Sequence, residues 1–279
     1  MIDLSTTEPW DTVASGFDEF LRPAFASYAS HAINLSGLVG GDRVLDIATG
    51  PGTLALQVAS SASFVSALDF SPLMLERLRR NLQDAAVGNV EVVLGDAQAL
   101  PFADCSFDYA FSMFGLMFCP DRAAAFREMR RVLRPGGTGV VTSWTKRTQI
   151  PLMDLIARVV SARNPLVRDG SGESNVPTLP LENPNELRRE MIEGGFRDVS
   201  VSQASFEFSY PDVATYWQAN LVCSAPLSVV KRAILGESSL GQAAWQAFVA
   251  EVESDLVAEL GASPIRYRWS ANFARAEAS

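Results

Sequence analysis

Three aspartates, Asp46, Asp69 and Asp96, each stand at or just beyond the end of a short apolar or β-branched run. If these runs are neighbouring parallel strands, their carboxyl ends meet along one edge of a sheet, where open α/β proteins bind ligands. A carboxylate there can pair with a cation, accept hydrogen bonds from both ribose hydroxyls, or accept from an exocyclic amine of a base. The spacing therefore predicts a site for a ligand that contains a nucleoside.

The first of these aspartates leads into a turn that contains Gly50 and Gly52, followed by a helical pattern that starts at Thr53. The glycines let a ligand approach the backbone, and the helix start offers free N–H groups. A nicotinamide or flavin dinucleotide fits this pattern, with Asp69 at its ribose. Asp46 opposes that interpretation because its carboxylate would face a pyrophosphate. S-adenosylmethionine (SAM) carries an ammonium and a sulfonium and no phosphate, so it suits the carboxylate better.

Predicted strands and helices alternate along the first half of the chain and position these residues. Two further strands are predicted in the second half. Strands are predicted at Arg43–Ile47, Phe64–Leu68, Val90–Leu94, Tyr109–Ser112, Thr138–Ser143, Asp198–Phe208 and Ile265–Ala274. Helices are predicted at Thr53–Ser60, Pro72–Ala85, Arg122–Leu133, Leu152–Ser161, Pro184–Gly194 and through most of Trp217–Leu260. Ser71 and Asp121 are placed to cap two of these helices. Such alternation predicts right-handed crossovers and a mostly parallel sheet with helices on both faces.

Three regions follow from this pattern. Residues 1–39 are expected to form an N-terminal helical lid, in which Trp10–Leu35 is one or two helices interrupted near Gly16 and Pro23. Residues 40–145 are expected to form the cofactor-binding core. Residues 146–279 should supply cap segments and the last two strands. Asn164–Asn183 is rich in Pro, Gly, Ser and Asn, and we expect a long loop that could gate the pocket.

Five motifs occur in the order and spacing found in class I SAM-dependent methyltransferases. They are Asp46-x-x-x-Gly50-x-Gly52, Asp69-Phe70-Ser71, Gly95-Asp96-Ala97, Phe107-Asp108 and Leu133-Arg134-Pro135-Gly136-Gly137. The resemblance covers about residues 40–145. It implies a Rossmann-like, seven-stranded, mostly parallel sheet with helices on both faces, an N-terminal helical lid, and a helical cap inserted around the sixth strand.

Within this superfamily the chain is similar to the branch that contains the ubiquinone/menaquinone C-methyltransferases and many small-molecule methyltransferases of specialised metabolism. Phe114-Gly115-Leu116 matches the quinone enzymes. Two positions depart from the pattern: Ala48 stands where glycine is common, and Met117-Phe118 stands where quinone methyltransferases have polar residues. The second departure argues against a quinone substrate.

The resemblance implies SAM as methyl donor, S-adenosyl-L-homocysteine as product, and no metal. The methionine end would contact the first motif, the ribose the second and the adenine the third. The expected cofactor contacts are Asp46, Thr49, Gly50, Gly52, Asp69, Phe70, Met74, Asp96, Ala97, Ser112 and Phe17. For the lid residue Phe17, and for Phe70 and Met74, packing in the core is an equally good interpretation.

The expected acceptor pocket is apolar. Its predicted residues are Met113, Met117, Phe118, Trp144 and Trp217, about half of which would serve the core instead. This lining suits a hydrophobic or aromatic small molecule. Methyl transfer by in-line displacement needs a base only when the acceptor must lose a proton. His31, the sole histidine, is a weak candidate for that base, and a structural role is the more common one for such a residue.

Composition limits the partners. The chain of 279 residues has 23 Lys plus Arg against 32 Asp plus Glu, a formal charge of −9 that repels nucleic acids and anionic membranes. The three cysteines lack the paired spacing of a zinc site, and the N-terminus lacks the pattern of a signal peptide. We expect a cytoplasmic monomer or homodimer that acts on a small molecule. Three alternatives remain open: a SAM enzyme with a non-methylating activity such as cyclisation, an NAD-dependent oxidoreductase, and a non-enzymatic interaction module.

Overall fold

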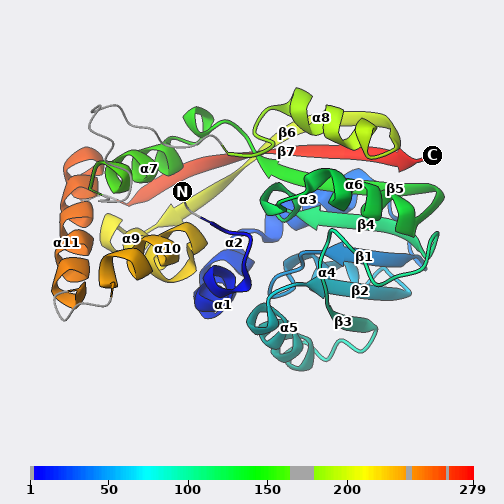
Figure 1. Cartoon of the computed structure of the whole chain (residues 1–279), viewed down its shortest axis with the longest axis horizontal. Helices are drawn as coiled ribbons and strands as arrows, with labels where there is room; N and C mark the ends of the chain where they lie inside the picture. The colour runs from blue at the N-terminus through cyan, green and yellow to red at the C-terminus, as the bar shows by residue number, and fades with distance from the viewer. Residues whose placement is uncertain (1–2, 164–178, 237–240, 262–263) are drawn as a thin grey trace.

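A seven-stranded sheet organises the part of the chain that the computed structural model describes, residues 3–163, 179–236, 241–261 and 264–279. Its order is β3-β2-β1-β4-β5-β7-β6 (Figure 1). The strands are β1 (Arg43–Ile47), β2 (Phe64–Asp69), β3 (Val90–Leu94), β4 (Phe107–Met113), β5 (Leu133–Trp144), β6 (Phe196–Tyr210) and β7 (Ile265–Ala278). The first five run parallel, and β7 is antiparallel to both its neighbours. The Rossmann-like prediction is thereby confirmed.

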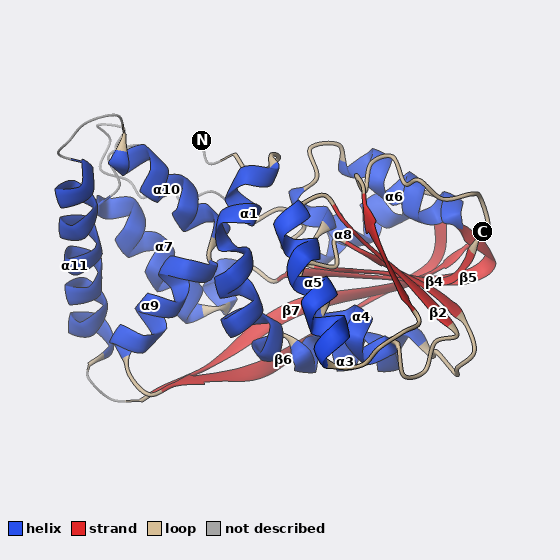
Figure 2. Cartoon of the chain, turned by 90° about the horizontal axis from the view of Figure 1, so that it is seen from below, coloured by secondary structure: helices blue, strands red, loops and turns tan. Residues whose placement is uncertain are grey.

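Helices cover both faces of the sheet. They are α1 (Thr7–Gly16), α2 (Arg22–Ala24), α3 (Ala26–Ser36), α4 (Thr53–Val58), α5 (Pro72–Asp84), α6 (Arg122–Val132), α7 (Pro151–Arg163), α8 (Pro184–Glu193), α9 (Val213–Cys223), α10 (Ala225–Leu235) and α11 (Gly241–Leu260). Figure 2 shows α3 and α4 on one side of the sheet and α6 and α8 on the other. As predicted, the Ser71 and Asp121 side chains cap α5 and α6 by accepting from the N–H groups of Met74 and Ala124. Among the described helices, none is long and apolar enough to cross a membrane.

The last two strands are longer than predicted. Residues 271–277 of β7 pair with β5, while residues 265–270 extend past β5 and pair with β6 in a two-stranded ribbon. The ribbon leads to the cap, where α11 packs against α7, α9 and α10 (Figure 2). The predicted helical region after Trp217 is thus three helices, the first of which begins at Val213.

The N-terminal helices lie between the sheet domain and the cap. The interruptions predicted near Gly16 and Pro23 are present: α1 ends at Gly16, a π-helical turn (η1, Phe17–Leu21) follows, and α2 contains Pro23. The pyrrolidine nitrogen of Pro23 cannot donate to the helix ladder, which explains the break there. Helix α1 packs on α5 on one side and on α9 and α10 on the other.

Two predicted boundaries differ from the structure. The Arg134–Gly137 segment, which lies between the predicted helix Arg122–Leu133 and the predicted strand Thr138–Ser143, is already part of β5, which begins at Leu133 beside Phe107. Gly136 still takes a positive φ of 78°, so the irregularity lies within the strand. Most of the predicted gating loop, residues 164–178, lies outside the described residues.

Candidate cofactor site

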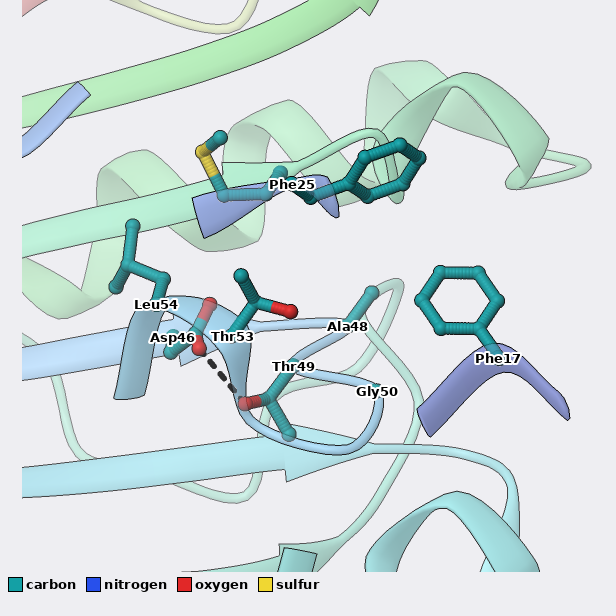
Figure 3. A pocket seen from close by; sticks show the side chains of 9 residues that line it. Phe17, Phe25, Asp46, Ala48, Thr49, Gly50, Thr53 and Leu54 are labelled. Atoms are coloured by element: carbon teal, nitrogen blue, oxygen red, sulfur yellow. Dashed lines mark hydrogen bonds between the residues drawn. The ribbon is translucent and has the colours of Figure 1, made fainter. Parts of the chain in front are cut away.

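Strand order places a crevice beside β1. The chain continues from β1 to β2 on one side, and β4 lies on the other side of β1, so the strand order reverses at β1. Ligands of open α/β sheets bind beyond the carboxyl ends of the strands at such a reversal. A pocket opens at this place. It is lined by Phe17, Phe25, Asp46, Ala48, Thr49, Gly50, Thr53, Leu54 and Met113. Figure 3 shows Phe25 across the pocket from Thr53, and Phe17 beside Ala48.

Asp46 carries an unpaired, buried oxygen in this pocket. The residue is 1% exposed; its Oδ2 accepts from Thr49 Oγ1 at 2.7 Å and from the Ala55 N–H at 3.1 Å. Its Oδ1 has no hydrogen-bond partner within the described structure. Burial, and to a smaller extent the nearby charge of Asp69, raises the pKa of Asp46 to about 7, against the two hydrogen bonds. A cationic group of a ligand would supply the missing partner.

Asp69 sits at the end of the neighbouring strand and orders the glycine turn. Its Oδ2 accepts from the Gly50 N–H at 2.8 Å and its Oδ1 from the Ser71 N–H at 2.9 Å. Burial, followed by the charge of Asp11, raises its pKa to about 6 against these hydrogen bonds. Each carboxylate oxygen retains a second lone pair, so the group can still accept from ligand hydroxyls.

Asp96 extends the row of acids along the sheet edge. Leu94 of β3 pairs with Asp69 of β2, and Asp96 follows two residues after Leu94. Its exposed carboxylate accepts from the backbone and side chain of Gln98 at 2.9 to 3.0 Å, while Ala97 is buried. The structure therefore brings the three predicted aspartates to one edge, in the order of their strands.

The other predicted cofactor residues differ in their surroundings. Thr49 and Gly50 line the pocket, and Gly52 follows in the same turn, where a side chain would collide with Leu78 Cδ1 at 2.3 Å. Phe17 also lines the pocket and meets Phe25 edge-on at 5.9 Å. The remaining predicted contacts are not part of the lining: Gly52, Asp69, Phe70, Met74, Asp96, Ala97 and Ser112. Phe70 is half-buried, Met74 is buried in a small cluster beneath α1, and Ser112 is buried with its hydroxyl accepting from the Leu116 N–H.

The predicted acceptor residues are divided between pocket and core. Of the five, Met113 lines the pocket, and Trp144 lies behind it, stacked on Phe114 at 4.0 Å. Met117 is buried in the core, and Phe118 meets Trp10 edge-on at 5.1 Å. Trp217 is fully buried in the cap, where its indole N–H donates to the Val249 carbonyl.

The structure does not bring His31 to the pocket lining. Its ring lies edge-on to Phe273 at 4.6 Å and to Phe206 at 5.9 Å, on the face of α3 that packs on the last two strands. A role as base therefore gains no support from the geometry. Sequence reasoning missed Phe25, Thr53 and Leu54, which line the pocket. Thr53 and Leu54 directly follow the glycine turn and could have been found from it, whereas Phe25 is brought in by the packing of the N-terminal helices.

Comparisons with known proteins agree with this geometry. A family described as "Methyltransferase domain" matches residues 44–137. The ubiquinone/menaquinone biosynthesis C-methyltransferase UbiE of Geobacter sp. (strain M21) is 34% identical over 179 residues, 60% of this chain and 76% of that protein. The chain belongs to the class I SAM-dependent methyltransferases.

Other similar proteins show how far this likeness extends. An uncharacterized protein of Mycobacterium tuberculosis is 42% identical over 110 residues, 39% of this chain and 40% of that protein, so the chain spans two fifths of that relative. A candidate methyltransferase from Bacillus halodurans shares the fold with a TM-score of 0.59 at 18% identity, over 90% of this chain and 98% of that one. The [4+2]-cyclase SpnF shares it with a TM-score of 0.56 at 20% identity, over 90% and 80%. The fold is therefore common to proteins described as methyltransferases and as a cyclase.

The family motif at Gly115 packs directly against the cofactor turn. A Cβ at Gly115 would lie 2.4 Å from the Cβ of Ala48 and 2.9 Å from Ser112 Oγ. Ala48 itself has a φ of 57°, a left-handed conformation that favours glycine. A glycine at position 48 would relieve this conformation, whereas the alanine present leaves no room for a side chain at position 115.

Gly115→Ala is expected to lower the free energy of unfolding by about 1 to 3 kcal/mol, because two backbone-linked methyl groups would overlap. Ala48→Gly removes one of them and relieves the left-handed strain, so Ala48→Gly/Gly115→Ala should recover most of the loss. Thermal unfolding of the three variants beside wild type measures this. A double variant no more stable than Gly115→Ala would show that Ala48 is not the source of the clash.

Proposed function

We propose that this protein transfers a methyl group from SAM to a hydrophobic or aromatic small molecule. The observation that carries the proposal is the buried Asp46, whose unpaired Oδ1 belongs to a pocket at the switch point of the sheet. An ammonium or sulfonium provides the cationic partner that this oxygen lacks, and a pyrophosphate does not. The residues present therefore fit SAM better than a dinucleotide.

The proposed cofactor contacts follow the row of acids. Asp46 and the turn at Thr49–Gly52 would hold the methionine end, Asp69 the ribose hydroxyls, and Asp96 with the Ala97 N–H the adenine. When bound, SAM supplies a methyl group on a sulfonium, which an acceptor takes by in-line displacement. The protein has to hold SAM and the acceptor in line and to exclude water. Such positioning can supply about 7–11 kcal/mol of the barrier reduction.

Water exclusion would fall to the lid. Phe17 and Phe25 come from the N-terminal segment and line the pocket with apolar rings. The aromatic packing continues from Phe25 to Trp144 at 5.6 Å, and from Trp144 to Trp269 at 5.4 Å. We propose residues 1–39 as the lid, residues 40–145 as the cofactor half, and the remainder as the part that encloses the acceptor.

The far end of this aromatic path offers one polar contact. Trp269 is 9% exposed, and its indole Nε1 has no hydrogen-bond partner within the described part of the chain. A buried donor without a hydrogen-bond partner lowers the stability of the fold by about 1–3 kcal/mol. An indole N–H left in this state therefore favours a role in binding. We propose that an oxygen of the acceptor takes this hydrogen bond. The acceptor class is then an aromatic molecule with a hydroxyl, ether or carbonyl oxygen.

Two measurements test the proposal. SAM and S-adenosyl-L-homocysteine should raise the unfolding temperature, and NADH should leave it unchanged; protection by NADH alone would favour an oxidoreductase. Methyl-labelled SAM should then transfer its label to members of a panel of aromatic compounds, and members with a hydroxyl, ether or carbonyl oxygen should react faster than members that carry the same nucleophilic atom without that oxygen. Tight SAM binding with no labelled product from the panel or from a cell extract would favour a non-methylating activity.

A further inference from the structure

Asn81 lies in α5, outside the pocket lining, and its side chain joins two segments that border the pocket. Its Nδ2 donates to Asp18 Oδ1 at 2.8 Å and to the Pro51 carbonyl at 2.9 Å. Asp18 directly follows Phe17 in the lid, and Pro51 stands between the two glycines of the cofactor turn. A single amide nitrogen therefore bridges the lid and the turn.

The chemistry of this bridge requires an asparagine-like group. A side-chain amide nitrogen carries two hydrogens, and each has an acceptor here. Asp18 is a charged acceptor whose side chain is 15% exposed, and it also takes a hydrogen bond from Arg22 Nε at 2.5 Å. Hydrogen bonds to a charged, partly buried group are stronger than neutral ones, so the link to Asp18 is the stronger half of the bridge.

The bridge fixes parts that the pocket depends on. Holding Asp18 holds the first turn of η1, from which Phe17 reaches the pocket. Holding the Pro51 carbonyl steadies the turn in which the Gly50 N–H donates to Asp69. Asn81 thus links the segment that carries Phe17 to the glycine turn.

We propose that Asn81 is a positioning residue that keeps the lid closed on the cofactor turn and slows release of the bound nucleoside. This rests on the proposed function, because it takes the pocket to be the SAM site. The two hydrogen bonds that the Asn81 side chain makes in the described structure go to Asp18 and Pro51, neither of which is an expected cofactor contact. Substitution of Asn81 should therefore act through the lid and the turn rather than through lost ligand contacts.

A second contact between α5 and the N-terminal segment supplies a matched control. Arg77 lies one helical turn before Asn81 on α5, and its Nη2 donates to Ser15 Oγ of α1 at 2.8 Å. This hydrogen bond also fastens the lid to α5 but does not reach the cofactor turn. Ser15→Ala removes it and leaves the Asn81 bridge intact.

The experiment measures S-adenosyl-L-homocysteine binding to the full chain by calorimetry and its dissociation by stopped flow. Asn81→Leu, which keeps the size and removes both donors, should weaken binding about tenfold, mainly through faster dissociation. Ser15→Ala should stay within about twofold of wild type. Asp18→Ala should weaken binding less than Asn81→Leu, and the Asp18→Ala/Asn81→Leu variant should match Asn81→Leu, because both changes remove the same bond.

The possible outcomes separate the two proposals. Wild-type protein that binds no S-adenosyl-L-homocysteine would overturn the proposed function. If the wild type binds S-adenosyl-L-homocysteine, three results would each overturn the bridge alone. The affinity of Asn81→Leu could equal that of the wild type, or Ser15→Ala could lose as much affinity as Asn81→Leu. The losses from Asp18→Ala and Asn81→Leu could also add in the double variant. Thermal unfolding without ligand shows whether Asn81→Leu is folded. If it is not, unchanged dissociation from Asp18→Ala is sufficient to overturn the bridge.

Discussion

Replacing Asp46 with asparagine is expected to weaken SAM binding by about 100-fold, equivalent to about 2.7 kcal/mol. The amide oxygen can take the place of Oδ2 and keep the hydrogen bonds from Thr49 Oγ1 and the Ala55 N–H. The amide nitrogen then occupies the position of Oδ1, so a donor replaces the unpaired acceptor in the pocket. The substitution removes the negative charge and reverses the polarity of one atom while preserving the turn.

Calorimetric titration with SAM measures the effect, and thermal unfolding without ligand should show Asp46→Asn to be at least as stable as wild type at pH 8. Asp108→Asn is a suitable control. Asp108 accepts from the N–H of Arg43, the first residue of β1, and pairs with Arg134, at the opposite end of the sheet from Asp46. Its substitution should leave SAM affinity within about twofold of wild type. Equal affinity of Asp46→Asn and wild type would remove the basis of the site assignment.

The affinity for SAM is expected to rise about 1000-fold between pH 5 and pH 8, about 100-fold from the ionisation of Asp46 and about tenfold from that of Asp69. Burial holds the pKa of Asp46 at about 7 and that of Asp69 at about 6, so both groups are largely protonated at pH 5. A cation binds the ionised carboxylate, and binding at low pH must therefore release a proton. Titration at several pH values measures the trend. In Asp46→Asn the step near pH 7 should disappear while the lower step, from Asp69, remains.

The ligand-free protein should respond to pH in the opposite sense. Both folded-state pKa values lie above the ordinary value of 3.8, so protonation of Asp46 and Asp69 favours the folded state. Their contribution to the free energy of unfolding is present in full below about pH 4 and is lost as the pH rises through 6 and 7. Denaturant unfolding across this range, compared with Asp46→Asn, isolates the Asp46 part. A wild type and variant with identical pH profiles would contradict the raised pKa.

Local patterns in the sequence predicted much of the sheet and the row of acids. A strand that ends in Asp46, a glycine turn and a helix start are encoded within about ten residues, and the capping residues Ser71 and Asp121 act on their own helices. Because parallel strands present their carboxyl ends at one edge, the three aspartates could be placed together without coordinates.

The apolar residues were harder to assign. Met113, Met117 and Trp217 have the same hydrophobic character, yet the first lines the pocket and the other two are buried elsewhere. Hydrophobicity drives burial without specifying against which neighbour a side chain packs. For the same reason His31 could be predicted to lie on a helix but not to face Phe273.

By itself, then, the sequence determined the order of strands and helices, the acids at the strand ends, and the cationic character of the ligand that suits them. Only the tertiary structure decided that Asp46 keeps an unpaired oxygen, that Ala48 and Gly115 touch, and that Asn81 bridges Asp18 to Pro51. These contacts join residues that are distant in sequence, and the packing of whole elements sets their geometry. Local propensity carries no information about such distances, whereas the lid closure and the acceptor enclosure that we propose depend on them.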